Sequence, residues 1–175
     1  MKRLTLITLV TLAALACAHT KTGPMATATL SPTTGQTAKG TVQFTETADG
    51  VQVTVDLTNV PPGVHGFHIH EGASCADDAK AAGGHFNPNN MPHAAPTDVS
   101  HHAGDFGNVT ADDKGEVHTT FMTHSVTVAA GPNSAVGHAV VLHANPDDLT
   151  TQPSGNAGAR IACGVVTAMA GSMQH

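Results

Sequence analysis

Hydrophobic and polar residues alternate along several short stretches of the chain. The alternation is clearest in residues 51–57, where valine or leucine occupies every second position, as in a half-buried β-strand. Residues 41–47 and 116–121 alternate more weakly, and residues 139–142 and 161–166 are apolar runs of the length of buried strands. No useful stretch has the spacing of an amphipathic helix. The pattern therefore predicts an all-β domain.

The segments between these runs predict turns and two long loops. Residues 48–50 and 112–115 combine aspartate with glycine, a hairpin signal, and short strands joined by such turns form a β-sandwich or barrel. Residues 71–106 and 144–160 instead contain several prolines and glycines. Loops longer than about 15 residues are usually functional or disordered. Because the first of them holds four of the thirteen histidines, we expect functional loops.

The start of the chain has the pattern of an export signal. A basic beginning and a twelve-residue apolar run, too short to span a bilayer, predict a signal peptide over residues 1–16. Cys17 stands where bacterial lipoproteins carry their lipid, although Ala14 replaces the usual leucine. Cleavage after Ala16 or Ala18 without a lipid is the alternative. We predict an exported protein of the periplasm or cell envelope, with Cys17 as a lipidation candidate that would tether it to a membrane.

The rest of the chain divides simply. We assign residues 17–38 to a tether and first strand region, with residues 18–28 as the flexible part because they are rich in alanine and threonine. Residues 39–170 form the main domain, and residues 171–175 form a flexible tail.

Composition excludes nucleic acid as a partner and leaves histidine unexplained. Seven basic residues against thirteen acidic ones give no basic surface for phosphates. The chain lacks tryptophan and tyrosine and has only five phenylalanines, so it offers no stacking platform for bases. Removal of the signal leaves a net charge of −8. Thirteen histidines exceed what solubility requires.

The cysteines predict one disulfide. With Cys17 set aside, Cys75 and Cys163 are an even pair in an exported protein, which favours a disulfide between them. Two separate buried thiols are the alternative.

The histidines suggest a metal site. His68 and His70 occupy alternate positions of an apolar run, so on a strand both imidazoles face one side. The residues that follow lack the aspartate and histidine of a metallo-β-lactamase and the glutamate of a cupin. Six histidines and one carboxylate make seven ligands, a number that suits two metals sharing one ligand, and imidazole favours copper and zinc; they are His68, His70, His85, His93, His102, Asp105 and His143.

Four motifs then carry a resemblance. Residues 65–71 (HGFHIHE), 84–88 (GHFNP), 102–108 (HAGDFGN) and 158–165 (GARIACGV) resemble the copper–zinc superoxide dismutase family, in order and in spacing. The similarity extends from about residue 40 to residue 167. It implies an eight-stranded Greek-key β-barrel, in agreement with the strand pattern.

The resemblance also implies the role of each site residue. Copper would be held by His68, His70, His85 and His143, and zinc by His85, His93, His102 and Asp105, with His85 bridging the two metals. Asp147 would accept hydrogen bonds from the far nitrogens of His68 and His93, and such partners fix ring orientation. Cys75 and Cys163 match the family's disulfide, and Arg160 matches its arginine beside copper.

The implied activity is dismutation of superoxide to dioxygen and hydrogen peroxide, which would protect the cell envelope. His85 would relay a proton, and Arg160 would attract the anion although the loop of residues 144–158 lacks the charged cluster of animal members. The alternative is a periplasmic copper and zinc carrier with a dismutase-like domain. Both a homodimer and a monomer are compatible with the sequence.

Other histidines have plainer interpretations. His101 competes with His102 for zinc, but the spacing to Asp105 favours His102. We expect His65 to support the barrel or a loop by hydrogen bonding. His118, His124 and His138 belong to no motif.

Overall fold

The computed structural model describes residues 23–170, so the expected signal peptide, Cys17 and the tail of residues 171–175 lie outside the described residues. The described part contains nine strands and one 3-10 turn, η1 (Lys80–Ala82). The strands are β1 (Met25–Pro32), β2 (Lys39–Thr47), β3 (Gly50–Thr58), β4 (Gly63–His70), β5 (Asp105–Ala111), β6 (Val117–Thr123), β7 (Ala139–His143), β8 (Arg160–Val165) and β9 (Thr167–Ala168). Over this range no helix has the length and apolar character needed to span a bilayer.

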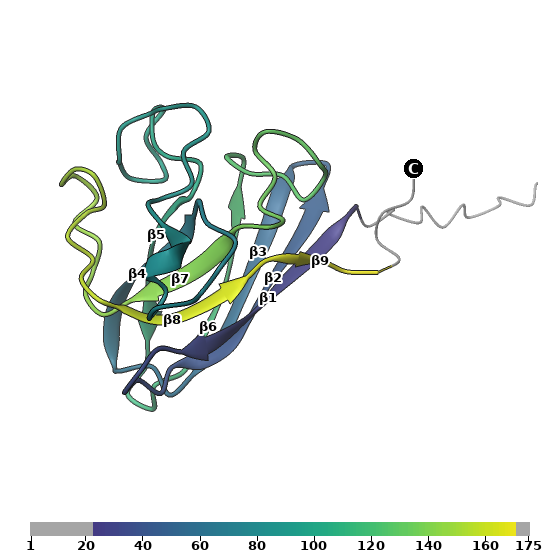
Figure 1. The fold of residues 1–175 in the computed structure, drawn as a ribbon. Coiled ribbons are helices and arrows are strands. Elements are labelled where there is room, and N and C mark those ends of the chain that lie inside the picture. Colours follow the sequence, from purple (N-terminus) through teal and green to yellow (C-terminus); the bar gives the residue numbers. More distant parts are fainter. Residues whose placement is uncertain (1–22, 171–175) are drawn as a thin grey trace, which may run out of the picture.

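The strands form a nearly closed antiparallel barrel (Figure 1), which confirms the predicted fold class. The order around the barrel is β5-β4-β7-β8-β1-β2-β3-β6, and the short strand β9 is a third partner of β1, beside β2 and β8. Several spatial neighbours are distant in sequence, such as β1 with β8 and β4 with β7, as a Greek-key arrangement requires. The predicted hairpin at residues 48–50 joins β2 and β3, with Thr47 paired to Gly50.

The second predicted hairpin is wrong. Residues 112–115 do form a turn, in which Asp112 Oδ1 accepts hydrogen bonds from the backbone of Lys114 and Glu116. The flanking strands β5 and β6 do not pair, however, and are the two ends of the strand order. The turn depends only on nearby residues, whereas the pairing of the two strands depends on the rest of the barrel. Here β5 pairs with β4, and β6 pairs with β3.

The flexible segment expected at residues 18–28 ends too late in the sequence, because its last residues belong to a strand. β1 begins at Met25, and Ala26 and Ala28 are fully buried opposite Phe44 and Val42 of β2. An alternation of alanine with threonine has little contrast in hydrophobicity, which is why the pattern reads as a linker rather than a strand.

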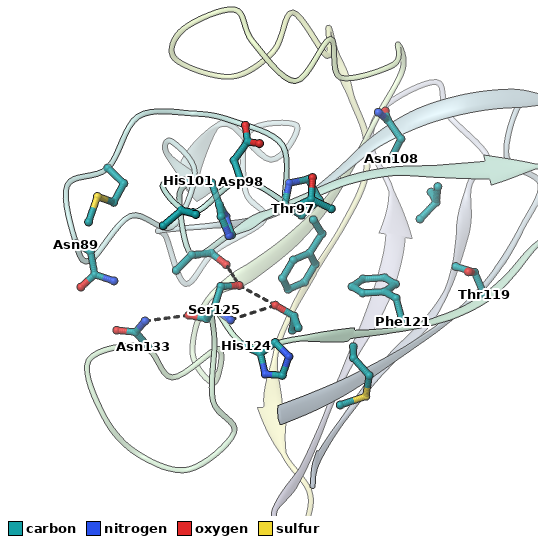
Figure 2. A pocket seen from close by; sticks show the side chains of 18 of the residues that line it. Asn89, Thr97, Asp98, His101, Asn108, Thr119, Phe121, His124, Ser125 and Asn133 are labelled. Atoms are coloured by element: carbon teal, nitrogen blue, oxygen red, sulfur yellow. Dashed lines mark hydrogen bonds between the residues drawn. The ribbon is translucent and has the colours of Figure 1, made fainter. Parts of the chain in front are cut away.

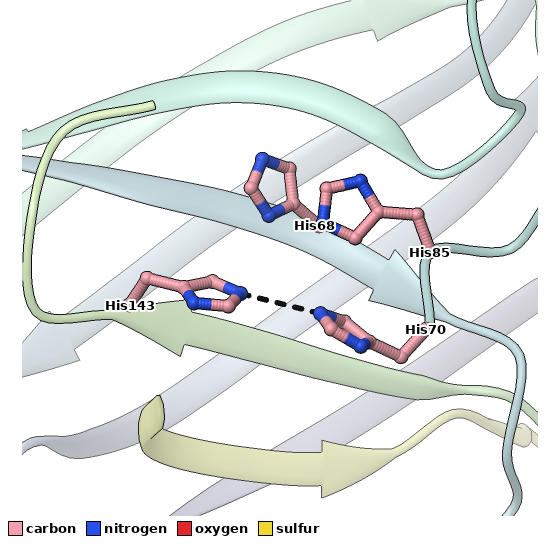
Figure 3. A group of neighbouring side chains, drawn as sticks. All are labelled: His68, His70, His85 and His143. Carbon is pink, nitrogen blue, oxygen red and sulfur yellow. Dashed lines mark hydrogen bonds between the residues drawn. The ribbon is translucent and has the colours of Figure 1, made fainter. Parts of the chain in front are cut away.

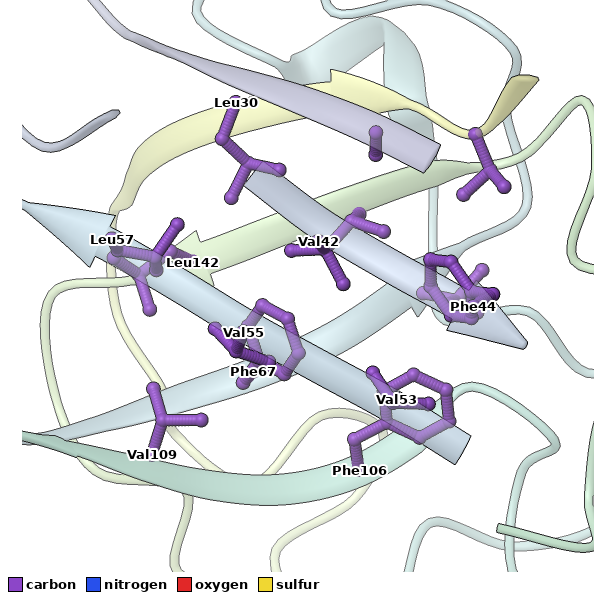
Figure 4. Close-up of a cluster of buried hydrophobic side chains, with 14 of the residues drawn as sticks. Leu30, Val42, Phe44, Val53, Val55, Leu57, Phe67, Phe106, Val109 and Leu142 are labelled. Carbon is purple, nitrogen blue, oxygen red and sulfur yellow. The ribbon is translucent and has the colours of Figure 1, made fainter. Parts of the chain in front are cut away.

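The barrel interior is packed with aliphatic and aromatic side chains (Figure 4). Phe106 packs against two other rings of this core, with its ring centroid 6.5 Å from that of Phe44 and 6.2 Å from that of Phe67. Burial of each large side chain contributes about 1.5–3 kcal/mol to stability. Other members of this core include Leu30, Val42, Val53, Val55, Leu57, Val109 and Leu142.

Strand β4 is buried on both faces, and this places the histidines. Phe67 and Ile69 belong to the barrel core, so His68 and His70 point away from it. They are nevertheless almost inaccessible to solvent. Two connections between strands, residues 71–104 and 144–159, are the predicted long loops, and they supply the groups that contact these two imidazoles.

Candidate metal centre

Four histidines meet on the outer face of the barrel. His68, His70, His85 and His143 each contribute a ring nitrogen to a group whose ligand atoms all lie within 4.8 Å of one another, as Figure 3 shows. His143 ends β7, next to β4. His85 comes from the first long loop, where it forms a bridge with His70 while the amide of Phe86 bonds to the carbonyl of Ile69. The sheet therefore positions this group.

A second group shares His85 with the first. It consists of His85, His93, His102 and Asp105, again with ligand atoms within 4.8 Å. Asp105 Oδ1 lies 2.7 Å from Nδ1 of His85, 3.0 Å from Nδ1 of His93 and 3.3 Å from Nδ1 of His102. Three nitrogens and one carboxylate oxygen converging in this way match the donor set of a four-coordinate zinc site.

Backbone hydrogen bonds leave two nitrogens of the first group facing each other. His70 Nδ1 lies 3.0 Å from the Gly83 carbonyl, and His143 Nδ1 lies 3.2 Å from the Gly158 carbonyl. Because a carbonyl only accepts, both rings donate from Nδ1, which leaves a lone pair on each Nε2. These two Nε2 atoms are 3.2 Å apart. Two lone pairs at this distance call for a cation between them.

Three further ring nitrogens fit bound cations. His68 Nδ1, His85 Nε2 and His102 Nδ1 are buried and have no hydrogen-bond partner among the described residues. Buried polar atoms nearly always have partners. For His85, Nδ1 faces Asp105 in the second group, so its Nε2 is free for the first. The ring can therefore serve one cation on each side.

Electrostatics favours the neutral imidazoles that ligation requires. Burial lowers the pKa of His143 to about 4. Burial, reinforced by the neighbouring His85, also holds the pKa values of His68 and His70 well below their ordinary value. The rings of the first group outside His85 are thus uncharged at neutral pH.

The second group is electrostatically different because it contains an acid. Burial by itself would raise the pKa of Asp105, but the hydrogen bond from His85 and the proximity of His93 and His102 hold it below its ordinary value. For His93, burial is outweighed by Asp105 and Asp147, and its pKa is raised. Burial lowers the pKa of His102. The carboxylate supplies the negative charge that balances a divalent cation.

Asp147 connects the two groups through the rings' far nitrogens. Its Oδ2 lies 2.8 Å from His68 Nε2 and its Oδ1 lies 3.0 Å from His93 Nε2. The main chain of Asp147 is itself held by Asn108 of β5, whose carboxamide accepts from the amide at 2.8 Å and donates to the carbonyl at 2.9 Å. Sequence reasoning missed this role of Asn108, since nothing in the sequence relates two residues that are 39 positions apart.

Arg160 lines a cavity of about 560 Å³ beside the first group. The cavity is lined by His70, His85 and His143 together with the guanidinium. Arg160 donates to the Ala79 carbonyl and, at 2.5 Å, to the Gly83 carbonyl. The Gly83 carbonyl also accepts from His70. A cation is thus fixed close to where a small anion would approach the histidines.

The predicted disulfide is confirmed and connects the first long loop to β8. Cys75 and Cys163 are bonded, with Cα atoms 5.7 Å apart. The bridge packs on a small apolar cluster that includes Ala79, Ala82 and Val141. It therefore anchors the loop segment whose carbonyls hold Arg160.

The other histidines of residues 23–170 lie outside both groups. His65 is buried, with Nδ1 2.8 Å from the His143 carbonyl and Nε2 2.7 Å from the Pro61 carbonyl, the supporting role that its sequence position predicts. His101 Nδ1 lies 2.6 Å from the His102 carbonyl and belongs to neither group. His118 is exposed and pairs with Asp56 across two strands at 2.9 Å.

A second hollow, of about 920 Å³, lies elsewhere in the described chain. It lies where β5 and β6 fail to pair, with Phe106, Phe121 and Ser125 among its lining residues (Figure 2). His101 and His124 also line it, but among the described residues no further group of three metal-binding side chains comes together. Among the described residues, the grouped metal-binding side chains therefore lie beside the smaller of these two cavities.

A comparison with known protein families agrees with this geometry. The family model of copper/zinc superoxide dismutase matches residues 38–166, a range that contains strands β2 to β8 and both long loops.

Proposed function

The chain belongs to the copper/zinc superoxide dismutase family, and on that premise we propose that its first histidine group holds copper and its second holds zinc. As a member it is an oxidoreductase that dismutates superoxide with copper and zinc as cofactors. The ligands we assign are His68, His70, His85 and His143 for copper and His85, His93, His102 and Asp105 for zinc. The observation that carries this assignment is the sharing of His85 by both groups.

The protein's own residues prepare the site for this reaction. When bound, copper supplies the one-electron chemistry by which one superoxide is oxidised to dioxygen and another is reduced, with uptake of two protons, to hydrogen peroxide. Arg160 presents a permanent cation to the incoming anion. Because His85 Nε2 faces the first histidine group without a hydrogen-bond partner among the described residues, it can hold a proton whenever it is not bound to the metal, and pass that proton to the reduced product. Asp105 Oδ1 lies 2.7 Å from Nδ1 of the same ring and so helps to fix its orientation.

Removal of one ligand from each group tests the assignment. His143 belongs only to the first group and His102 only to the second. Purified His143→Ala should retain zinc but lose copper affinity and dismutation, whereas His102→Ala should lose zinc affinity. His118→Ala, an exposed histidine outside both groups, is the matched control and should behave as the wild type. A chain that binds both metals but does not dismutate superoxide would instead be a metal carrier.

We further propose that the protein works outside the cytoplasm and protects the cell envelope from superoxide. The sequence of residues 1–16 supports export, and the Cys75–Cys163 disulfide supports an oxidising compartment. The intact mass of the protein from its native host tests both export and the lipid on Cys17. A mass that includes residues 1–16 would contradict export, and an unmodified Cys17 or its absence would contradict the anchor.

A further inference from the structure

The side chain of Gln152 holds both backbone groups of His93. Its Oε1 accepts from the His93 amide at 2.9 Å, and its Nε2 donates to the His93 carbonyl at 2.7 Å. The same Nε2 lies 3.3 Å from the Thr150 carbonyl of its own loop. A carboxamide is the side chain that offers one donor and one acceptor side by side, so it can pair with a residue in the way a neighbouring strand would.

His93 depends on such a partner because no strand contains it. In the first group, His68, His70 and His143 lie on strands, and His85 bridges to β4. In the second, the backbone of His102 bonds to Asp105, three residues away. His93 lies in an irregular segment, and the hydrogen bonds of its main chain go to Gln152, which is 59 positions distant.

The ring of His93 faces a carboxylate at each of its two nitrogens. Nδ1 lies 3.0 Å from Asp105 Oδ1, and Nε2 lies 3.0 Å from Asp147 Oδ1. Asp147 and Gln152 belong to the same loop, so this loop contacts His93 once at its ring and once at its backbone. A small shift of the main chain would spoil both ring contacts, since a ligand is oriented only as well as its supporting contacts are fixed.

We propose that Gln152 is a positioning residue for zinc, which acts through the backbone of His93. The inference rests on the proposed function, because it takes His93 as a zinc ligand. Gln152 is exposed and touches neither Asp105 nor Asp147 through a hydrogen bond. Among the zinc-binding residues and Asp147, its hydrogen bonds therefore reach only His93, through the main chain.

The rate of zinc release from the fully metal-loaded protein to an excess of a chromogenic chelator tests the proposal. Gln152→Ala should release zinc about tenfold faster, the lower end of the effect of losing a ligand's supporting contact. Gln152→Glu keeps the acceptor for the His93 amide but lacks the donor for its carbonyl, and its release rate should be intermediate. With cobalt in place of zinc, the visible absorption of both variants should shift, because their ligand geometry changes.

Thr151→Val is the matched control. It removes the hydroxyl that donates to Asp148 at 2.7 Å, a bond of the same loop that does not touch His93. Zinc release and the cobalt spectrum should stay at wild-type values. Equal acceleration in Thr151→Val and Gln152→Ala would mean that the loop matters only as a whole, and would overturn the positioning role.

His93→Ala separates this inference from the proposed function. Wild-type zinc retention in His93→Ala would overturn the ligand assignment itself. Loss of zinc from His93→Ala together with wild-type release from Gln152→Ala and Gln152→Glu would leave the assignment intact and overturn the role of Gln152. If Gln152→Ala does not fold, the release rate of Gln152→Glu against Thr151→Val decides.

Discussion

Asp147 Oδ2 lies 2.8 Å from His68 Nε2, and both side chains are completely shielded from solvent. An ionised carboxylate only accepts hydrogen bonds, so the ring donates from Nε2 and keeps its lone pair on Nδ1. That Nδ1 is one of the nitrogens without a partner among the described residues. Asp147 makes the same kind of contact with His93 through its other oxygen. It therefore selects the tautomer of one histidine in each group.

Asp147→Asn should weaken metal binding although it preserves the shape of the side chain. The amide presents an N–H to one of the two rings, and that ring must then turn or change its tautomer. We expect affinity for at least one metal to fall by about 10–100-fold, measured by competition with chelators of known affinity. Asp113→Asn, on an exposed turn, is the control. Unchanged affinities for both metals would refute this role of Asp147.

Gly155 is packed so closely against the site that it admits no side chain. It has φ of +66°, and a Cβ there would stand 1.7 Å from Asp147 Oδ1 and 2.7 Å from His93 Nε2. Gly155→Ala should therefore displace Asp147 and weaken zinc binding by tenfold or more, roughly as loss of a supporting contact does. Gly35 has φ of +77° with nothing within 4 Å. Gly35→Ala should cost only the backbone strain of about 1–2 kcal/mol and leave zinc in place.

If Arg160 attracts superoxide as we propose, it does so against the net charge of the protein, which is −8 for the chain without residues 1–16. Arg160→Glu should reduce kcat/KM by about tenfold or more, the lower range of electrostatic steering, while both metals stay bound. Arg160→Lys keeps the charge but loses the forked guanidinium that bonds to two carbonyls. Its kcat/KM should therefore lie between those of the wild type and Arg160→Glu. Stopped-flow decay of superoxide measures both. Full activity of Arg160→Glu would show that the guanidinium has no part in attraction.

How far the sequence predicts the structure depends on the range of the interactions involved. The alternation of Val51 with Gln52 and their successors specifies β3, because burial on one face is a local property. The turn at Asp112 is also local and forms as predicted. The separation of β5 from β6 after that turn depends on partners elsewhere in the barrel, and no local pattern reveals it.

The same distinction holds for the site. The motifs around His68 and Asp105 are long enough to be compared with those of the dismutase family. The structure brings all seven proposed ligands together in two groups. The supporting contacts of Asn108, on β5, and of Gln152, in the second long loop, join segments distant in the sequence and use ordinary polar side chains. A single carboxamide carries no pattern of its own, so only the folded structure reveals these two residues.

The disulfide should contribute both stability and activity. Loss of the Cys75–Cys163 bond, which spans 88 residues, should lower the free energy of unfolding by about 4–5 kcal/mol in the loop-entropy description. Because the bridged segment also holds Arg160 through Ala79 and Gly83, activity should fall too. Urea unfolding of a variant with both cysteines changed to serine tests this, and reduced wild type should match it. An unchanged midpoint would refute the contribution to stability.

The metal-free protein should lose stability as the pH falls from about 6.5 toward 4. Burial lowers the pKa of His143 to about 4 and the pKa values of His68 and His70 well below ordinary, whereas in the unfolded chain all three titrate near 6.5. The unfolded state therefore binds more protons in this window, and acid favours it.

The pKa shift of one histidine gives the approximate size of this loss in stability. His143 alone accounts for about 3 kcal/mol between the two pKa values. His93 opposes the trend, because its raised pKa gives stability below pH 6.5 that is lost at higher pH. Urea unfolding of the metal-free, disulfide-intact protein at pH 7.5, 6 and 5 measures the sum. His143→Asn should flatten the profile, and a free energy of unfolding that stays constant or rises on acidification would show that these rings are not held neutral by burial.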